Sequence, residues 1–362
     1  AALRAAGHLT AAADLGGAAA EAPWPPHPAL APRGDAARQN RADDERAWQT
    51  QAESGFTGLA PQVRIKCGKL HAKIGKTYFF FQNAMSVALE HFVAAREHFA
   101  AAGDTSLLVG SDSQVGWALR TQGKRDEALA YCHKAMDAAE AQGLLPEVGE
   151  AGHNLGNLYR EIGDLAKAEQ YFVASIAAYE QAKARQNFIA KSKSGLAMVY
   201  ADLSRWQEAT ELQAWCMDLV ERIGIISGQM TIGFHLGNCY LNTGDLTKAE
   251  TYFNRSLALS RDKGDVRRQG KCWESLAKVA QIQGRHESAV SALQHALVLA
   301  RDAGAPVPEQ AKLLCDILES PSHNDGRSDI LDRLAQSVSD LPPGPLLVRA
   351  QALMAAQPAG SH

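Results

Sequence analysis

Gly75-Lys76-Thr77 has a composition suited to phosphate chemistry, because Gly-Lys-Thr ends the loop that holds phosphate in many nucleotide-binding proteins. That loop requires a second glycine five residues before Gly75, where this chain has Leu70, and Gly68 is two residues too early. No strand precedes the segment either. We therefore interpret it as part of a first helix, with a phosphate loop as the disfavoured alternative.

Histidine and cysteine offer no better basis for catalysis. His91 and His98 stand seven residues apart with His71 upstream, and none of the twelve histidines has the H-E-x-x-H or Cys/His spacing of a zinc site. The chain shows no nucleophile elbow, paired catalytic carboxylates or glycine-rich dinucleotide loop. The sequence thus predicts a protein without enzymatic activity, metal or cofactor.

The charge, hydropathy and cysteine content of the chain limit which partners and which cellular compartment fit it. The formal net charge is −3, with 37 basic and 40 acidic residues, which disfavours general nucleic-acid binding. No apolar run approaches the roughly 18 residues that a membrane-spanning helix requires. The six cysteines are scattered without a C-x-x-C pair, so buried thiols in a reducing, cytoplasmic compartment are the favoured interpretation.

The strongest signal is a repeat of about 40 residues. Small residues recur in one register through the middle of the chain, at Ala88, Ala128, Ala168, Ala209, Ala249 and Ala289. Two further series share it: Gly103, Gly143, Ala184, Gly224, Gly264 and Gly304, and Gly123, Gly163, Ser204, Gly244 and Gly284. The single 41-residue step places the extra residue between Ala168 and Ala184.

Each series has a physical cause in a pair of antiparallel helices. Glycine supplies the positive φ that ends a helix, and alanine lets two helices approach closely. Four residues after each alanine, on the same helical face, stand Phe92, Cys132, Phe172, Gln213, Phe253 and Leu293. The first helix carries its own stripe at i, i+4 spacing, as in Leu155/Tyr159 and Leu236/Tyr240. The pattern predicts six helix pairs.

Two segments carry the pattern most fully: Asn154-Leu155-Gly156-Asn157-x-Tyr159 and His235-Leu236-Gly237-Asn238-x-Tyr240, each followed by Gly-Asp-Leu-x-Lys-Ala-Glu. The pattern resembles tetratricopeptide repeats over roughly residues 63–304, in a 40-residue-period form similar to Pins-type polarity scaffolds, kinesin light chains and bacterial Rap-type peptide receptors. Repeat four departs from it, with Ser204-Arg205 for Gly-Asp and Gln213 for the bulky residue. The resemblance implies an all-α, right-handed superhelical solenoid of about six antiparallel helix pairs with C-terminal capping helices.

In such a solenoid the first helices line a concave wall, and their outward positions become candidates for peptide binding. Asn157 and Asn238 are the leading candidates, because a carboxamide offers a donor and an acceptor to an extended backbone. Lysine and arginine on the same wall would favour an acidic segment. The alternatives are carboxamides that cap or bridge helices and a solvated charged face. The predicted peptide-binding residues are Asn154, Asn157, Arg160, Lys191, Met198, His235, Asn238, Asn242, Lys271 and Lys278.

We expect an organisation in four parts: a largely disordered Ala/Pro-rich segment at 1–60, the solenoid at 61–304, capping helices at 305–340 and a flexible tail at 341–362. The predicted function is a non-enzymatic scaffold that binds a peptide segment of a partner protein. The alternative functions are a peptide-sensing module whose superhelix changes pitch on binding, and an enzyme with its chemistry in the terminal segments. The oligomeric state stays open.

Overall fold

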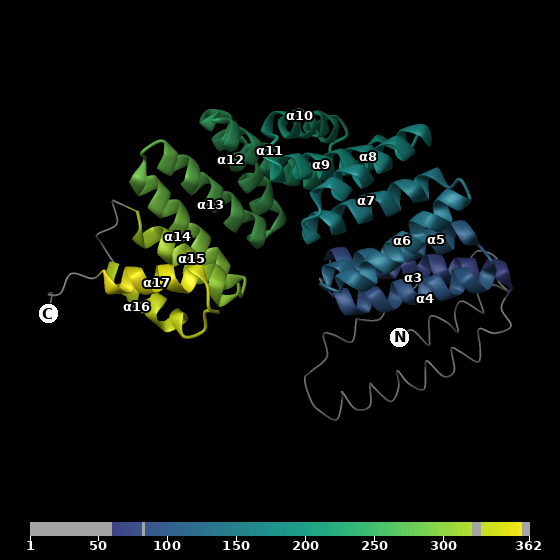
Figure 1. The fold of residues 1–362 in the computed structure, drawn as a ribbon, viewed down its shortest axis with the longest axis horizontal. Coiled ribbons are helices and arrows are strands. Elements are labelled where there is room, and N and C mark those ends of the chain that lie inside the picture. Colours follow the sequence, from purple (N-terminus) through teal and green to yellow (C-terminus); the bar gives the residue numbers. More distant parts are fainter. Residues whose placement is uncertain (1–59, 82–83, 321–326, 357–362) are drawn as a thin grey trace, which may run out of the picture. The chain divides into compact units, whose positions relative to one another are not determined.

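The structure, a computed structural model, describes residues 60–81, 84–320 and 327–356. Within these ranges it contains fifteen α-helices and no strand (Figure 1). The helices form two compact units that meet in sequence at Glu147 and Val148. The predicted N-terminal segment lies outside the described residues, apart from Ala60.

The helices alternate between a first and a second helix of each repeat, and within each unit neighbouring helices such as α3 and α4, α5 and α6, or α13 and α14 contact each other. The first unit holds α3 (Pro61–Phe81), α4 (Met85–Ala102), α5 (Thr105–Thr121) and α6 (Arg125–Ala141). The second unit holds α7 (Leu145–Ile162), which begins just before the boundary, α8 (Leu165–Gln181), α9 (Gln186–Asp202), α10 (Trp206–Arg222), α11 (Ile226–Thr243), α12 (Leu246–Lys263), α13 (Val266–Ile282) and α14 (His286–Asp302). The predicted all-α fold of paired helices is confirmed as a tetratricopeptide-like helical solenoid.

Three shorter helices follow the repeats: α15 (Val307–Leu318), α16 (Arg327–Val338) and α17 (Pro345–Ala355). The sequence analysis expected capping helices at 305–340, and α15 and α16 lie within that range. The stretch expected to be a flexible tail from residue 341 includes α17, where Ala350 is fully buried in the same cluster as Leu313 and Leu334. Apolar residues at helical spacing, from Leu346 to Met354, turn one face of α17 towards this cluster.

The core of each repeat follows the predicted register. All six alanines of the second helices are 0 % exposed, and the six residues four positions later are at most 3 % exposed. In repeat three, a Cβ on Gly156 would lie 2.8 Å from the Phe172 ring, and a Cβ on Gly195 would overlap with it. Phe172 therefore fills a notch between two first helices that only glycine leaves open.

Repeat four keeps its packing although a polar residue replaces the aromatic one. Gln213 is 1 % exposed, and both ends of its amide are bonded to Ser194: Oε1 accepts from Ser194 Oγ at 3.1 Å, and Nε2 donates to the Ser194 carbonyl at 3.3 Å. A buried side-chain amide whose donor and acceptor are both hydrogen-bonded destabilises the fold far less than one left without hydrogen bonds. Ala197 stands opposite it, where repeat three has Gly156.

A second buried bond recurs in the same register. Ser175 Oγ donates to the Gly149 carbonyl at 2.6 Å, Cys216 Sγ to the Ala190 carbonyl at 3.3 Å and Ser256 Oγ to the Met230 carbonyl at 2.7 Å. Each donor is fully buried and stands 26 residues after its acceptor. The bond joins the second helix to the start of its own first helix, and the sequence pattern gave no sign of it.

The geometry of the turn between paired helices explains why the segment Gly-Asp-Leu-x-Lys recurs. Gly163 has φ 93°, and the Asp164 carboxylate accepts a hydrogen bond from the Lys167 amide at 3.1 Å, which caps α8. The Lys167 ammonium pairs with Asp164 at 3.1 Å and lies 5.0 Å from the centre of the Tyr159 ring. Gly244, Asp245, Lys248 and Tyr240 repeat this arrangement.

Repeat four closes the same turn with different residues. Ser204 takes the left-handed conformation at φ 59°, and the Arg205 guanidinium lies 4.0 Å from the Tyr200 ring centre while pairing with Glu169 and Glu208. The extra residue of repeat three is placed differently from the prediction. Lys183, not Ala184, has positive φ, at 49°, so the insertion follows it in the loop before α9.

Three histidines lie together between α3 and α4. His71 Nδ1 is 2.9 Å from His91 Nδ1, and the His71 and His98 rings stack at 5.5 Å. Burial, helped by the charge of His71, lowers the pKa of both His91 and His98 to about 4, and burial lowers the pKa of His71 as well. No group of three metal-binding side chains with suitable geometry occurs among the described residues. These histidines are therefore neutral core residues of the first unit.

We expect Gly195→Ala to lower the free energy of unfolding by about 1–3 kcal/mol, because the added methyl overlaps with the Phe172 ring. The matched control is Gly270→Ala in α13, where a Cβ meets nothing within 4 Å. That change should be neutral or stabilising by about 0.5–1 kcal/mol, since a helical glycine costs backbone entropy. Urea denaturation measures both, and equal effects would contradict the assigned register.

The histidine cluster should make the first unit acid-sensitive. Because the folded pKa values lie below the unfolded value near 6.5, the unfolded state binds more protons, and stability falls as the pH drops from about 6.5 towards 4. Urea midpoints between pH 7.5 and 5 should decline, and His91→Gln should make the decline shallower. The control His295→Gln, at an exposed position of α14, should leave it unchanged. A pH-independent midpoint would refute this account.

Candidate functional site

The first-helix face is defined here as the side of α7, α9, α11 and α13 that carries the predicted binding residues. One position of each helix forms a row in the repeat register: Asn157, Met198, Asn238 and Lys278. The first three side chains are partly buried and Lys278 is exposed. These four residues, drawn from four separate helices, are therefore accessible at equivalent places along the second unit.

The asparagines of this face each use one donor on their own helix. Asn157 Nδ2 donates to the His153 carbonyl at 2.9 Å, Asn238 Nδ2 to the Phe234 carbonyl at 3.1 Å and Asn242 Nδ2 to the Asn238 carbonyl at 2.8 Å. Among the described residues no donor contacts their carboxamide oxygens. The bonds fix the side-chain orientation and leave an acceptor on each asparagine for another molecule.

Asn154 is a correction to the sequence analysis. It was expected to be exposed, yet only 5 % of it is accessible, because it lies on the packed side of α7 beside the 7 %-exposed His153. His153 Nδ1 lies 3.3 Å from Ser192 Oγ, which is 2.8 Å from Ser175 Oγ. This buried polar chain ties α7, α8 and α9 together, and Ser192, at 0 % exposure, cannot reach a substrate.

The cations of the first-helix face differ in whether a carboxylate of this chain already pairs with them. Arg160 pairs with Asp202 of the next repeat, which the sequence did not anticipate and which offsets its charge. Lys191, Lys271 and Lys278 are exposed, and within the described part of the chain Lys271 and Lys278 form no ion pair. Arg268 lies 5.1 Å from the centre of the Phe234 ring. Positive charge therefore concentrates on α13, beside the uncharged residues of α11.

The pKa of His235 is sensitive to this concentration of charge. Its pKa is lowered to about 3, first by burial and then by the charges of Arg268, Arg160 and Lys271. The ring is therefore neutral at physiological pH, surrounded by three cations from α7 and α13. An anionic group placed here would gain Coulomb energy that a neutral one would not.

The segment Gly75-Lys76-Thr77 lies inside α3, as its interpretation as helix requires. Gly75 is buried, and a Cβ there would lie 2.8 Å from the Phe92 ring. Thr77 Oγ1 donates to the Lys73 carbonyl at 3.0 Å within the same helix. A helix interior has no free backbone amides to hold phosphate, so no phosphate loop forms here.

The described helices include none that is both long and apolar enough to cross a bilayer. None of the six cysteines forms a disulfide, and all six are buried.

Comparison with known proteins identifies the repeats. The family model described as "Tetratricopeptide repeat" matches residues 111–181 and 229–302. A curated relative, tetratricopeptide repeat protein 29 of Trypanosoma brucei brucei, is 22 % identical over 230 residues, which cover 60 % of this chain and 46 % of that protein. The chain thus spans about half the length of this relative.

Solved structures share the fold at low identity. A Rap protein complexed with Competence and Sporulation Factor has a TM-score of 0.56 at 16 % identity, with 83 % of this chain and 80 % of that one covered. The apo form of the quorum sensor NprR from B. thuringiensis has a TM-score of 0.55 at 14 % identity, with 88 % and 94 % covered. The repeat register, the paired helices and the matched family model agree: the chain carries tetratricopeptide repeats at residues 111–181 and 229–302, within a solenoid of helix pairs.

Proposed function

We propose that this chain is a non-enzymatic interaction module that binds a peptide segment of a partner protein on the first-helix face. The row of Asn157, Met198, Asn238 and Lys278 supports this proposal. It places hydrogen-bonding side chains and one apolar contact at the repeat spacing along four parallel first helices. A regularly spaced set of acceptors and donors suits the regularly spaced amides of a polypeptide.

The proposed partner segment is acidic, and the observation that carries this is the environment of His235. Burial and then the charges of three nearby cations lower its pKa to about 3, and neither Lys271 nor Lys278 has a carboxylate partner in the described residues. A glutamate or aspartate bound between α11 and α13 would pair with Lys271 and relieve the repulsion among the cations. Met198 and Phe234 would supply apolar contact beside it.

The similar structures support a peptide-sensing variant of the same function. Rap was solved with Competence and Sporulation Factor bound, and NprR is a quorum sensor. At 14–16 % identity these likenesses establish the fold alone. Our second proposal is that this chain is a peptide sensor. Peptide binding would change the pitch of the solenoid and thereby change the activity of an attached or associated protein.

We also propose that the protein works in a reducing compartment such as the cytoplasm. Burial raises the pKa of Cys216 to about 12 and that of Cys239 to about 11, so these thiols stay protonated and unreactive. Six buried thiols without a disulfide suit such a compartment.

Selection of a displayed library of random 15-residue peptides against the full chain tests the interaction. We expect the binders to be enriched in aspartate and glutamate. Asn238→Ala and Lys271→Ala should each weaken the best binder about 5- to 30-fold, the loss of one or two hydrogen bonds to a charged or polar group. Isothermal titration measures the affinity, and thermal midpoints should stay nearly unchanged.

The matched control is Asn254→Ala, at an exposed asparagine of the second helix α12. It should leave the affinity intact. Binders without acidic residues would refute the charge preference. Binders whose affinity is the same in Asn238→Ala and Lys271→Ala would refute binding on the first-helix face.

Small-angle scattering separates the two proposals. With the selected peptide at saturation, a change in the radius of gyration of the full chain is expected for a sensor, because stacked repeats rotate relative to one another. Unchanged dimensions at full occupancy would favour the passive scaffold.

A further inference from the structure

A cavity of about 440 Å³ lies in the second unit where the last repeat meets the capping helices. Its wall includes Lys278 and Gln281 of α13, His286 and Leu293 of α14, and Ser320 at the end of α15. The volume falls in the range of sites that hold small ligands or the end of a peptide. The cavity adjoins the first-helix face, because Lys278 belongs to both.

Two buried polar atoms in this wall have no hydrogen-bond partner: His286 Nδ1 and Ser320 Oγ. Ser320 is 6 % exposed. Among the described side chains of the second unit these are the two with such atoms, and both line the same cavity. A buried polar group without a partner destabilises the fold, so two at one place indicate a molecule that supplies the missing bonds.

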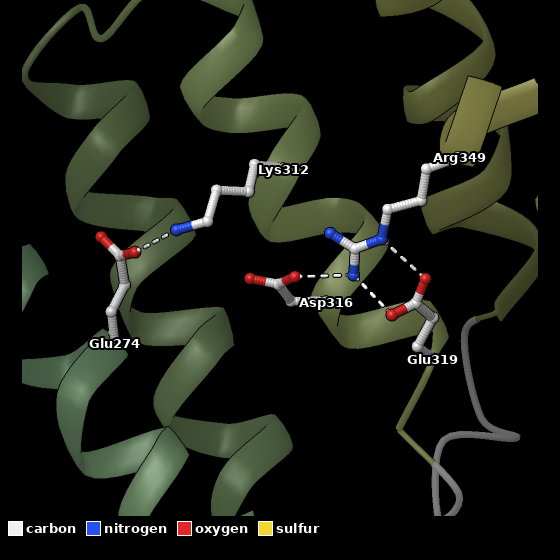
Figure 2. A network of polar contacts seen from close by, with 5 residues as sticks. All are labelled: Glu274, Lys312, Asp316, Glu319 and Arg349. Carbon is white, nitrogen blue, oxygen red and sulfur yellow. Dashed lines mark hydrogen bonds and ion pairs between the residues drawn. The ribbon is translucent and has the colours of Figure 1, made fainter. Parts of the chain in front are cut away.

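The charges around the cavity are distributed unevenly. The wall contains three carboxylates, and a cation holds each of them: Lys312 holds Glu274 at 2.9 Å, and Arg349 of α17 holds Asp316 and Glu319, each at 2.7 Å. Figure 2 shows these contacts. The hydrogen bonds to Arg349 lower the pKa of Glu319, which keeps it ionised. Lys278 differs, since within the described residues it forms no ion pair. The cavity thus offers one unpaired ammonium beside two unpaired polar atoms.

We propose that this cavity binds a carboxylate, and specifically the free C-terminal carboxylate of the peptide that the first-helix face holds. Lys278 supplies the charge, Ser320 donates its hydroxyl proton, and His286 donates from the Nδ1–H tautomer. With three donors around one carboxylate, His286 Nδ1 and Ser320 Oγ gain the hydrogen bonds they lack, and the charge of Lys278 is neutralised. This assignment deepens the proposed function and rests on it for the identity of the ligand.

A chain terminus suits this position better than an internal acidic residue. Residues along the face, Asn157, Asn238 and Lys278, lead to the cavity in register, and α15 packs against α14 directly beyond it. A bound polypeptide that follows the row therefore reaches the capping helices and must end or leave the surface. Leu293 and Ala277 line the cavity and would contact the last side chain.

The test uses the full chain and a small probe, N-acetyl-glycyl-alanine, with its C-terminal amide as comparison. Labelled-histidine NMR follows the His286 signal, assigned by its loss in His286→Gln. We expect saturable shifts with the acid and at least tenfold weaker binding of the amide. An N-acetylated peptide amide with an internal aspartate distinguishes a side-chain carboxylate from a terminal one.

Two variants give independent readouts. Lys278→Met should weaken binding of the acid about tenfold or more, while Lys263→Met, at an exposed lysine of the second helix α12 outside the cavity wall, should not. Ser320→Ala should also weaken binding, yet leave the thermal midpoint of the free protein unchanged or higher, because it removes a buried hydroxyl that has no partner. A purely structural serine would instead lower the midpoint.

The outcomes separate this inference from the proposed function. The dipeptide is too short to cover the first-helix face, so a response of His286 tests the cavity alone. Equal binding of acid and amide, tighter binding of the internal aspartate, or no shift at millimolar probe would overturn the inference while leaving peptide binding on the face untouched.

Discussion

The packing of a second-helix side chain against a small residue of its first helix is the constraint on which this structure depends. Phe172 on Gly156, Phe253 on Gly237 and Phe92 on Gly75 are the same contact in three repeats, and each ring is fully buried. The contact sets the distance between paired helices. It also fixes their rotation, and therefore decides which side of each first helix remains accessible.

The outward row of Asn157, Met198, Asn238 and Lys278 is a consequence of that rotation. Each of these residues stands one position after the glycine or alanine that receives the second-helix side chain, as Asn157 follows Gly156 and Asn238 follows Gly237. Since successive residues on a helix are about 100° apart, burying the glycine turns its successor towards the edge of the packed face. The packing that builds the core thus also spaces the candidate binding groups.

Much of this was predictable from the sequence, because close packing and turns both impose residue types. The alanine and glycine series predicted helix pairs, turns and core positions, and in the sequence Pro306 and Pro321 flank the segment that forms α15. The errors arose where side chains compensate for one another. Gln213 and Arg205 break the pattern by residue type, but Ser194 and the Tyr200 ring satisfy them through contacts that no spacing reveals.

The candidate site was less predictable for the same reason. Register showed which residues point outward, but not that Arg160 pairs with Asp202 or that Asn154 is buried, since both depend on the neighbouring repeat. The cavity at Lys278 was missed altogether. It arises because the capping helices, unlike a seventh repeat, do not continue the repeat register.

That difference in packing also explains where the unsatisfied polar atoms of the second unit lie. Inside this part of the array, Ser175 and Ser256 donate to carbonyls of their own first helices, because the same geometry recurs in repeats three and five. At the end of the array the caps bury Leu313, Ile317 and Leu334 efficiently, but they bring no partner to His286 or Ser320. Removing those polar groups would have been an easy substitution for a purely structural cap. Their presence beside an unpaired lysine is therefore better explained by a ligand than by packing.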